Sequence, residues 1–495
     1  MAGTDSTYRR RRRFDQTPEP PPATEGADVE PLLAPPGPGF VVQQHYATRL
    51  HHDVRLEMMS GSKPVLVSWA VPKGLPRRKG VKALAVRTED HPAEYATFSG
   101  TIPEGNYGAG EVRIFDAGTY EMLKRDNEKL TFRLEGKRIR GTYHLVRTGL
   151  EDGRERWLAI LSQDDRPPAE PFPQLDPMLA TLVPQPFDDP SFLVEPKWDG
   201  IRALAICGEN TALVSRRRND ITAGYPELAN LHDRVVALDA VLDGEIVSFV
   251  RGVPSFQRLQ QRMHVRDQKQ LERLARTAPV VYMAFDLIYL DGRSLISEQL
   301  GERRRLLEEA LVASEAVQLS PAVVGEGLAL YAAAEAQGLE GVVAKRVASK
   351  YEPGARSRSW LKVKFVLEAD VVVAGWTDGS GRRQGELGSL VMALYDDDQL
   401  RYVGNVGTGF DRQSLTDAMT RLRALEEIPN PFPTGAVTSR PELRKAHWIT
   451  PVLVAAVEYR QLTQGGRLRA PSFKGFRTDK EPRECTVDQL PRSVE

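Results

Sequence analysis

Short segments in which apolar and polar residues alternate make up most of residues 40–163, and turns rich in glycine separate them. Residues 103–110, with the sequence PEGNYGAG, form one such turn. Alternation with a period of two is typical of half-buried β-strands, and no long stretch here has the helical period. We therefore predict a compact, barrel-like β-domain over residues 40–163.

The pattern changes in residues 178–368, where apolar strands alternate with helical stretches such as residues 302–311. This alternation predicts a domain of the α+β class. Strands dominate again in residues 369–495, so we expect a small β-barrel there. The predicted strands are residues 203–206, 241–250, 280–290 and 341–345 in the first region and 371–374, 389–395, 402–406 and 452–459 in the second.

Two Pro-rich segments flank the predicted β-domain. Residues 1–39 contain five consecutive arginines, Arg9 to Arg13, and eight prolines. Because such a composition buries too little apolar surface to fold, we expect a disordered tail. The arginine run either contacts DNA phosphates or is simply solvated. Residues 164–177 contain five prolines and are predicted to be a linker between domains.

Composition excludes some classes of protein without indicating a function. Hydrophobic residues make up 41% of the chain and charged residues 27%, as in an average globular protein. The 67 basic and 67 acidic residues balance, so net charge provides no argument for a nucleic-acid partner. No apolar run approaches the roughly 20 residues that cross a bilayer. Cys207 and Cys485 form no metal-ligand motif, so we expect a reduced, cytoplasmic protein.

The first candidate for chemistry is Lys197, in the sequence EPKWDGIR of residues 195–202. A lysine amine is a nucleophile only when deprotonated, and neighbouring cations or burial lower its pKa. Taken alone, this motif is more often a surface turn. An ordered series of charged motifs beside later strands favours a catalytic site instead: DGE at 243–245, FDL at 285–287, EGVVAK at 340–345 and WLKVK at 360–364.

This ordered set resembles the covalent nucleotidyltransferases, and most closely the bacterial ATP-dependent DNA ligases of the ligase D type, over residues 177–482. The resemblance implies an ATP-grasp-like α+β nucleotidyltransferase core over residues 178–368, an OB-fold β-barrel over residues 369–495, and ATP and magnesium as cofactors. It also implies that Lys197 takes the AMP group. The other implied nucleotide-binding residues are Glu195, Arg202, Arg216, Glu245, Phe285, Glu340, Lys362, Lys364, Arg477 and Lys480, of which Glu245 and Glu340 serve the metal or the ribose.

Lys362 and Lys364 can also be argued from the residues themselves. Side chains two apart on a strand share one face, so both ammonium groups can converge on one phosphate. The alternative is a solvated edge strand whose lysines prevent aggregation. Arg477 and Lys480 lie in a basic stretch suited to any polyanion. Relatives often have glycine where this chain has Arg218, so we expect the loop after Arg216 to differ.

The second candidate site is a cluster of histidines near the start of the predicted β-domain. On a strand, His51, Asp53 and Arg55 share one face, and His52 points the other way. Two imidazoles and a carboxylate suit a divalent transition metal such as manganese, and an adjacent guanidinium suits a phosphate. His45 would supply the second imidazole. The alternative is a polar strand face with exposed histidines.

This segment also resembles the 3'-phosphoesterase domain of ligase D proteins, over residues 40–163. Relatives often have arginine where Ala83 stands and lysine where Leu161 stands, so part of the phosphate-binding set differs in this chain. The resemblance implies metal binding by His45, His51 and Asp53, catalytic roles for His51, Asp53, Arg55 and His91, and secondary roles for Lys73 and Tyr95.

These motifs together predict an enzyme that cleans a DNA 3' end and then seals the strand, in double-strand break repair by non-homologous end joining. The expected partners are DNA with nicks or broken ends and, by resemblance, the end-binding protein Ku and a separately encoded polymerase. The chain is expected to be a nucleoid-associated monomer. Two alternatives share the same motifs: an RNA ligase or capping-type nucleotidyltransferase, and an inactive scaffold that binds DNA ends.

Overall fold

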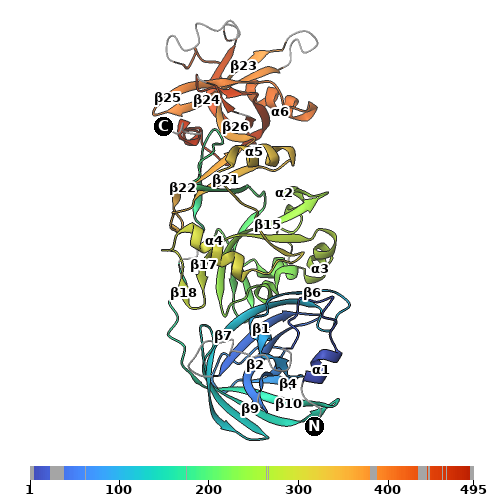
Figure 1. Cartoon of the computed structure of the whole chain (residues 1–495). Coiled ribbons are helices and arrows are strands. Elements are labelled where there is room, and N and C mark those ends of the chain that lie inside the picture. Colours follow the sequence, from blue (N-terminus) through green and yellow to red (C-terminus); the bar gives the residue numbers. More distant parts are fainter. Residues whose placement is uncertain are drawn as a thin grey trace. The chain divides into compact units, whose positions relative to one another are not determined.

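The structure is a computed structural model that describes residues 5–22, 38–61, 63–173, 176–263, 265, 267–379, 387–432, 443, 446–459, 461–463 and 465–490 (Figure 1). The chain forms two compact units. The first comprises residues 1–176, 201–246 and 261–319, and the second comprises residues 177–200, 247–260 and 320–495. The predicted α+β region therefore contributes to both units, because its strands join two different sheets.

An eight-stranded antiparallel barrel forms the N-terminal part of the first unit, which confirms the predicted barrel-like β-domain. The barrel closes because β1 pairs with both β2 and β7. Its order is β1 (Gly39–Tyr46), β2 (Leu50–Ser60), β3 (Lys63–Val71), β4 (Lys82–Arg87), β10 (Arg154–Asp164), β9 (Arg140–Glu151), β8 (Lys129–Gly136) and β7 (Gly110–Arg125), with β5 (His91–Pro92) beside β3 and β6 (Gly100–Ile102) beside β7.

The barrel interior is filled by large apolar side chains. Phe40, Trp69 and Phe132 are fully or almost fully buried there. Burial of such side chains is the main stabilising contribution to a barrel, since each contributes roughly 1.5–3 kcal/mol. Because successive side chains along a strand point to opposite faces, the residues between the buried ones in β8 and β10 point away from the apolar interior.

Residues 5–22, which we call the N-terminal strap, pack against the barrel. The strap begins with α1 (Asp5–Arg10), whose Tyr8 is only 1% exposed. The Tyr8 ring contacts the rings of Phe14, His91 and Tyr95. The expectation of a disordered tail is therefore wrong for these residues. Composition alone pointed to disorder because two of the three aromatic partners of Tyr8, His91 and Tyr95, lie far away in sequence.

The rest of the first unit is a second sheet with helices beside it. Its helix α4 (Leu300–Ala310) packs on β17 (Val280–Leu290) through the fully buried ion pair Arg303–Asp286, at 2.8 Å. The predicted linker packs here too, since Tyr289 donates a hydrogen bond to the Glu170 carbonyl. The sheet order is β14 (Thr211–Ser215), β13 (Ile201–Cys207), β15 (Ala240–Val250), β17 (Val280–Leu290) and β18 (Arg293–Ser294), with β19 (Val317–Leu319) parallel to β17 and α3 (Gln268–Thr277) nearby in sequence.

The second unit contains a five-stranded sheet that carries the Lys197 motif. Helix α5 (Gly327–Ala336) packs on it, and Val194, Val342 and Val363 form part of the apolar layer between them. The sheet order is β11 (Leu179–Leu182), β22 (Arg356–Lys364), β21 (Gly341–Arg346), β12 (Phe192–Pro196) and β20 (Val323–Val324), and the same unit holds β16 (Val253–Pro254) and α2 (Phe256–Gln260).

A five-stranded antiparallel sheet with its own apolar core forms the C-terminal part of the second unit, as expected for an OB-type domain. Its order is β25 (Gln399–Val406), β24 (Leu387–Asp396), β23 (Leu367–Asp378), β26 (His447–Tyr459) and β29 (Ser472–Arg477), accompanied by α6 (Arg412–Arg423) and the hairpin of β27 (Gln461–Leu462) and β28 (Leu468–Arg469).

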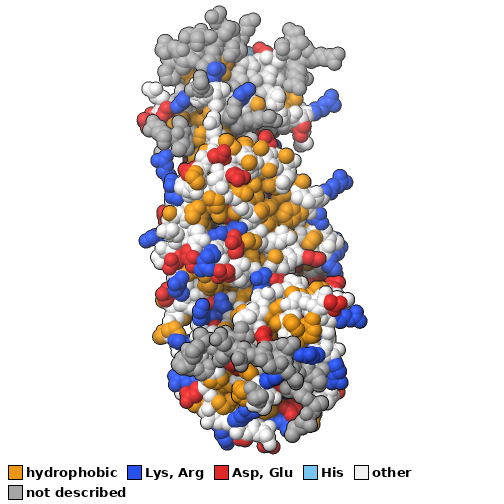
Figure 2. Space-filling model, viewed as in Figure 1, with side chains coloured by type: hydrophobic (Ala, Val, Ile, Leu, Met, Phe, Trp, Pro, Cys, Tyr) orange, Lys and Arg blue, Asp and Glu red, His pale blue; other side chains and the backbone are white. Residues whose placement is uncertain are grey.

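Short 3-10 turns complete the described elements: η1 (Ala93–Thr97), η2 (Thr222–Gly224), η3 (Pro226–Leu228), η4 (Leu231–Arg234), η7 (Pro482–Glu484) and η8 (Val487–Gln489). None of the helices in the described part of the chain has the length and apolar character that crossing a membrane requires. Figure 2 shows basic and acidic side chains interspersed over the visible surface, in agreement with the balanced composition.

Candidate nucleotide and metal sites

Lys197 lies directly after β12, where the chain leaves the five-stranded sheet. Its backbone N–H donates to the Gly341 carbonyl at 2.9 Å, which extends the pairing of β12 with β21. Its ammonium group is ion-paired with Glu340, and the other Glu340 oxygen lies 2.7 Å from the Lys364 ammonium. The fold thus brings together three of the predicted site residues from three separate segments.

Burial and mutual repulsion shape the charges around Lys197. Burial, together with Lys197, Lys364 and Arg356, lowers the pKa of Lys362 to about 8. For Lys364 the effect of burial is reversed by Glu340, so its pKa is raised. Burial raises the pKa of Glu340, but the two lysines lower it more strongly. Glu340, with Asp199 and Glu368 nearby, therefore offsets the charges of Lys197 and Lys364, while the neighbouring cations oppose the charge of Lys362.

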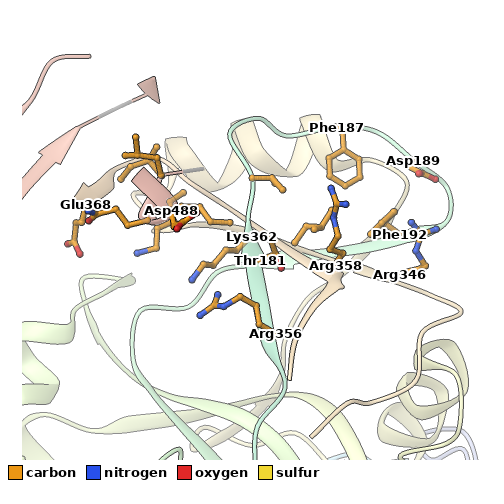
Figure 3. Close-up of a pocket in the computed structure, with 17 residues that line it drawn as sticks. Thr181, Phe187, Asp189, Phe192, Arg346, Arg356, Arg358, Lys362, Glu368 and Asp488 are labelled. Carbon is orange, nitrogen blue, oxygen red and sulfur yellow. The ribbon is translucent and has the colours of Figure 1, made fainter. Parts of the chain in front are cut away.

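A cleft of about 1150 Å³ is lined by Lys362 and Lys364, and Lys197 is not among its lining residues (Figure 3). Figure 3 shows Lys362 and Arg356 next to each other on its wall. Arg356 donates to the Ala180 carbonyl at 2.7 Å. Within the described residues, Lys362 and Arg358 form no ion pair. Basic residues outnumber acidic ones in the cleft lining, which favours phosphates; the basic residues are Arg346, Arg356, Arg358, Lys362 and Lys364, and the acidic ones are Asp189, Glu368 and Asp488.

Glu195 is deeply buried rather than open to the cleft. It is 2% exposed and lies 2.8 Å from the ammonium of the equally buried Lys345. Lys345 in turn lies over the Trp360 ring, 4.5 Å from its centre. Sequence reasoning did not single out Lys345 as the partner of Glu195, although both belong to the recognised motifs.

The remaining predicted nucleotide residues of the α+β region lie in the first unit. Arg202 is held by Asp243 at 2.5 and 2.6 Å, and its guanidinium lies over the Phe285 ring at 4.5 Å. Glu245 is directly opposite Arg202 in the pairing of β13 with β15. The fold thus brings Arg202, Glu245 and Phe285 to one part of this sheet.

Arg216 lies in the exposed turn after β14. Two residues later, Arg218 has a φ of 62°, a conformation that glycine adopts more readily than other residues. Its guanidinium donates to Asp176 at 2.7 Å. An ion pair with Asp176 thus accompanies the unfavourable backbone angle at Arg218.

Arg477 and Lys480 are paired within the C-terminal domain. Lys480 lies 2.8 Å from Asp370, and Arg477 contacts both Asp370 and Asp479. In the described residues, their ion-pair partners all belong to this domain. Their predicted contact with the pyrophosphate of ATP stays a prediction.

In the barrel, the predicted metal ligands lie together where β1 ends and β2 begins. His45 Nδ1 and His51 Nε2 each lie 3.7 Å from an Asp53 carboxylate oxygen. The other ring nitrogens are occupied, because His45 Nε2 lies 2.9 Å from the Gly108 carbonyl and His51 Nδ1 lies 3.0 Å from the Arg49 carbonyl. These carbonyls orient the rings so that the ligand atoms of all three residues converge within 4.8 Å. The donor set fits a divalent metal ion.

Arg55 connects this cluster to His91. It donates to Asp53 at 2.8 Å, to Gln43 at 2.7 Å and to Ser68 at 2.9 Å. Its Nη1 also lies 2.9 Å from His91 Nδ1. Burial raises the pKa of Asp53, but Arg55 and the two histidines lower it more, so its net pKa is low. Burial, with Arg55 and Arg12 nearby, lowers the pKa of His91.

The N-terminal strap adds residues that sequence reasoning missed. Arg12 Nη2 lies 3.3 Å from His91 Nε2, and its guanidinium pairs with Glu19 at 2.7 Å and Glu89 at 3.3 Å. Tyr95 donates to Glu19 at 3.1 Å. The only local signal for these contacts was the arginine run, whose composition pointed to disorder instead.

Two predicted residues of the barrel lie elsewhere. His52 faces away from the metal cluster, as strand alternation predicts, and its ring packs edge-on against Phe115. Burial lowers the pKa of His52 to about 4, so it is neutral at physiological pH. Lys73 lines the same small cavity as His52 rather than the space around His91.

Three family models match the chain in the order that the sequence motifs indicated. Residues 43–147 match the DNA ligase D 3'-phosphoesterase domain. Residues 177–364 match the ATP-dependent DNA ligase domain. Residues 383–480 match the C-terminal region of ATP-dependent DNA ligases.

Among curated proteins, the chain is similar to multifunctional non-homologous end joining proteins named LigD. It is 40% identical over 486 residues to the one from Mycobacterium tuberculosis strain H37Rv, with 96% of this chain and 60% of that protein aligned. It is 34% identical to the Pseudomonas aeruginosa protein, with 97% of this chain and 61% of that protein aligned. The chain thus spans about three fifths of the length of these relatives.

Among solved structures, the chain is similar to the ligase domain of Mycobacterium tuberculosis LigD. The identity is 34%, 64% of this chain and 99% of that chain are covered, and the TM-score is 0.47. A mycobacterial DNA ligase D complexed with ATP and MES has the same identity and coverage, with a TM-score of 0.39.

Proposed function

Because the chain belongs to the DNA ligase D family, we propose that it seals DNA strand breaks with ATP by way of a lysyl-AMP intermediate on Lys197. The observation that carries this proposal is the cluster of Lys197, Glu340 and Lys364, with Lys362 beside it and a cationic cleft next to it. Phosphoryl transfer needs positioning and charge neutralisation more than it needs reactive side chains, and this cluster supplies both.

In the first step, the Lys197 amine attacks the α-phosphorus of ATP. A P–N bond forms, the attacking nitrogen releases a proton to solvent, the bond from the α-phosphorus to the bridging β-phosphate oxygen breaks, and pyrophosphate leaves. The cationic Lys362 and Lys364 neutralise the charge on the phosphates, and Glu340 holds the lysine amine in place before ATP binds. The AMP then passes to a DNA 5'-phosphate, and a 3'-hydroxyl displaces it to close the strand.

The other nucleotide-binding roles rest on the resemblance together with the local geometry. We assign Arg202, Arg216, Phe285 and the buried Glu195 to the nucleotide, and Arg477 and Lys480 to the pyrophosphate. Glu245 and Glu340 are assigned to magnesium or to the ribose. Magnesium would supply further neutralisation of phosphate charge.

Labelling with radioactive ATP and GTP tests the nucleotide and the nucleophile together. ATP is expected to label wild type and Lys269→Ala, a variant of an exposed lysine on α3, but not Lys197→Ala. Sealing of a nicked DNA duplex should follow the same pattern. Labelling by GTP alone would instead support a capping-type enzyme. Sealing that survives Lys197→Ala would support a scaffold that recruits another ligase.

We further propose that the barrel is a metal-dependent 3'-phosphoesterase that cleans DNA 3' ends. His45, His51 and Asp53 would hold manganese or another divalent metal, which would polarise the phosphate and supply a nucleophilic water. Arg55 is placed to bind the phosphate oxygens, and His91, with its lowered pKa, is a neutral imidazole beside them. Arg12 lies on the other side of His91 and adds a second guanidinium.

Release of inorganic phosphate from a 3'-phosphate primer-template with manganese tests this activity. The His51→Ala, Asp53→Ala double variant should release none, while Lys197→Ala should release as much as wild type. If wild type releases no more phosphate than the double variant, the barrel has no phosphoesterase activity.

The names of the relatives and the paired activities support a role in non-homologous end joining. We propose that the chain acts as a nucleoid-associated cytoplasmic monomer on nicks and broken DNA ends, with the end-binding protein Ku and a separate polymerase as partners. Joining of linear duplexes should rise when purified Ku is added, and nick sealing should not. Equal joining with and without Ku would remove Ku from the proposal.

A further inference from the structure

Two residues inside the arginine run, Arg11 and Arg12, contact residues at or beside the proposed phosphoesterase site. Tyr8 contacts the His91 ring, with ring centres 5.2 Å apart, and Arg12 lies over the Tyr8 ring at 3.9 Å. Arg11 pairs with Glu89 at 2.9 Å and donates to the Tyr107 hydroxyl at 2.8 Å. Two of the five arginines are thus used to hold the strap in place.

Arg9 and Arg13 have a different environment. Each is the direct neighbour in sequence of a residue that touches His91, yet both side chains are exposed. Within the described residues neither forms an ion pair or a side-chain hydrogen bond. Consecutive Cα atoms are about 3.8 Å apart, so the backbone of each residue lies next to a residue that touches His91, while its side chain is exposed to solvent.

We propose that Arg9 and Arg13 bind the backbone phosphates of the DNA strand whose 3' end enters the site at His91. This inference rests on the proposed phosphoesterase function and adds a contact surface to it. A 3'-terminal phosphate at Arg55 and His91 places the next phosphates of the same strand a few ångströms further out. Exposed guanidiniums anchored there match a polyanion with regularly spaced charges, and such contacts carry no base specificity.

Counterion release gives this proposal a quantitative signature. Each phosphate neutralised by an arginine steepens the salt dependence of duplex binding by about 0.9 in a log–log plot. Loss of two contacts therefore lowers the slope by roughly 1.8, and the ratio of wild-type to variant affinity changes about tenfold between 50 and 200 mM salt.

The test compares Arg9→Gln, Arg13→Gln with a matched double variant, Arg125→Gln, Arg154→Gln, in the full chain. Arg125 and Arg154 are exposed arginines at strand ends of the same barrel. The substrate is a 3'-phosphate primer-template, and kcat and KM for phosphate release are measured at several salt concentrations. We expect the strap variant to show a raised KM, an unchanged kcat and the flatter slope, and the control to match wild type. Equal slopes in both variants overturn the proposal.

A second measurement keeps this inference distinct from the proposed activity. The two native cysteines are buried, so Gln16→Cys, an exposed strap position, can carry a photo-crosslinker. Crosslinking to the primer strand near its 3' end is expected, even in the His51→Ala, Asp53→Ala background that cannot release phosphate. Crosslinking that is unaffected by Arg9→Gln, Arg13→Gln counts against the proposal. Absence of phosphate release from wild type counts only against the phosphoesterase activity.

Discussion

Replacement of Lys362 by arginine should remove an alkaline loss of ATP affinity. Lys362 has a pKa of about 8 because it is largely buried and faces Lys197, Lys364 and Arg356. If its ammonium form binds the triphosphate, ATP binding favours the charged state. The affinity for ATP is then highest at pH values well below the pKa of Lys362 and declines as the pH rises through that pKa. Arginine stays charged at every accessible pH, so Lys362→Arg should hold ATP equally well throughout this range.

The size of the effect follows from proton linkage. For a single group that must be protonated, the apparent Kd rises by a factor of one plus ten to the power of the pH minus the pKa. With the pKa of about 8, the Kd at pH 9 should be about tenfold higher than its low-pH limit, and at pH 7 it should be within about 10% of that limit. Lys364 does not interfere, because Glu340 keeps its pKa high.

The assay is equilibrium binding of α,β-methylene ATP, whose α–β bridge does not break, between pH 7.5 and 9.5 at constant ionic strength. Wild type and Lys269→Arg should show the alkaline loss, and Lys362→Arg should not. Lys362→Gln should bind weakly at every pH, because it lacks the charge throughout. The same alkaline loss in Lys362→Arg as in wild type would refute the assignment of Lys362 to the phosphates.

Three further predictions follow from the packing and the metal cluster. Arg303→Met leaves Asp286 buried without its partner and should destabilise β17 and α4 by about 3–5 kcal/mol, measured by hydrogen exchange. The Asp286→Leu, Arg303→Met double variant should recover most of that loss. If it recovers none, the unpaired Asp286 is not the cause of the destabilisation. Gly341→Ala should abolish the labelling of Lys197 by ATP, because Gly341 has a φ of 152° and a Cβ there would overlap the Val363 carbonyl oxygen. The control is Gly208→Ala, because a Cβ at Gly208 would meet open space. Chelation should stop phosphate release and manganese should restore it, whereas release that persists through exhaustive chelation would contradict a metal site at His45, His51 and Asp53.

Local patterns predicted the individual elements well. The apolar run at residues 280–290 coincides with β17 (Val280–Leu290), and the helical stretch at residues 302–311 overlaps α4 (Leu300–Ala310). Strand alternation also placed Asp53 and Arg55 on one face, and in the structure they are hydrogen-bonded. These features depend on the periodicity of neighbouring residues, which is written directly in the chain.

Contacts between segments far apart in the chain were harder to predict from the sequence. Nothing local indicated that Lys345 would pair with Glu195, or that Arg12 would reach Glu89 and His91. The Pro- and Arg-rich composition of the N-terminal residues even pointed the wrong way for residues 5–22. A short segment with one tyrosine cannot stabilise itself, and its order comes from a barrel surface formed by other residues.

The sequence by itself determined the order of the three family matches and the class of each domain, and it predicts Lys197 as the nucleophile and His45, His51 and Asp53 as metal ligands, because motif spacing and strand period are local properties. Only the tertiary structure decided that the α+β region supplies two sheets to two compact units, that Glu340 holds Lys197 and Lys364, and that the strap lies against His91. These arrangements are set by burial and ion pairing between segments far apart in the chain, and no local pattern encodes which distant partner each residue will meet.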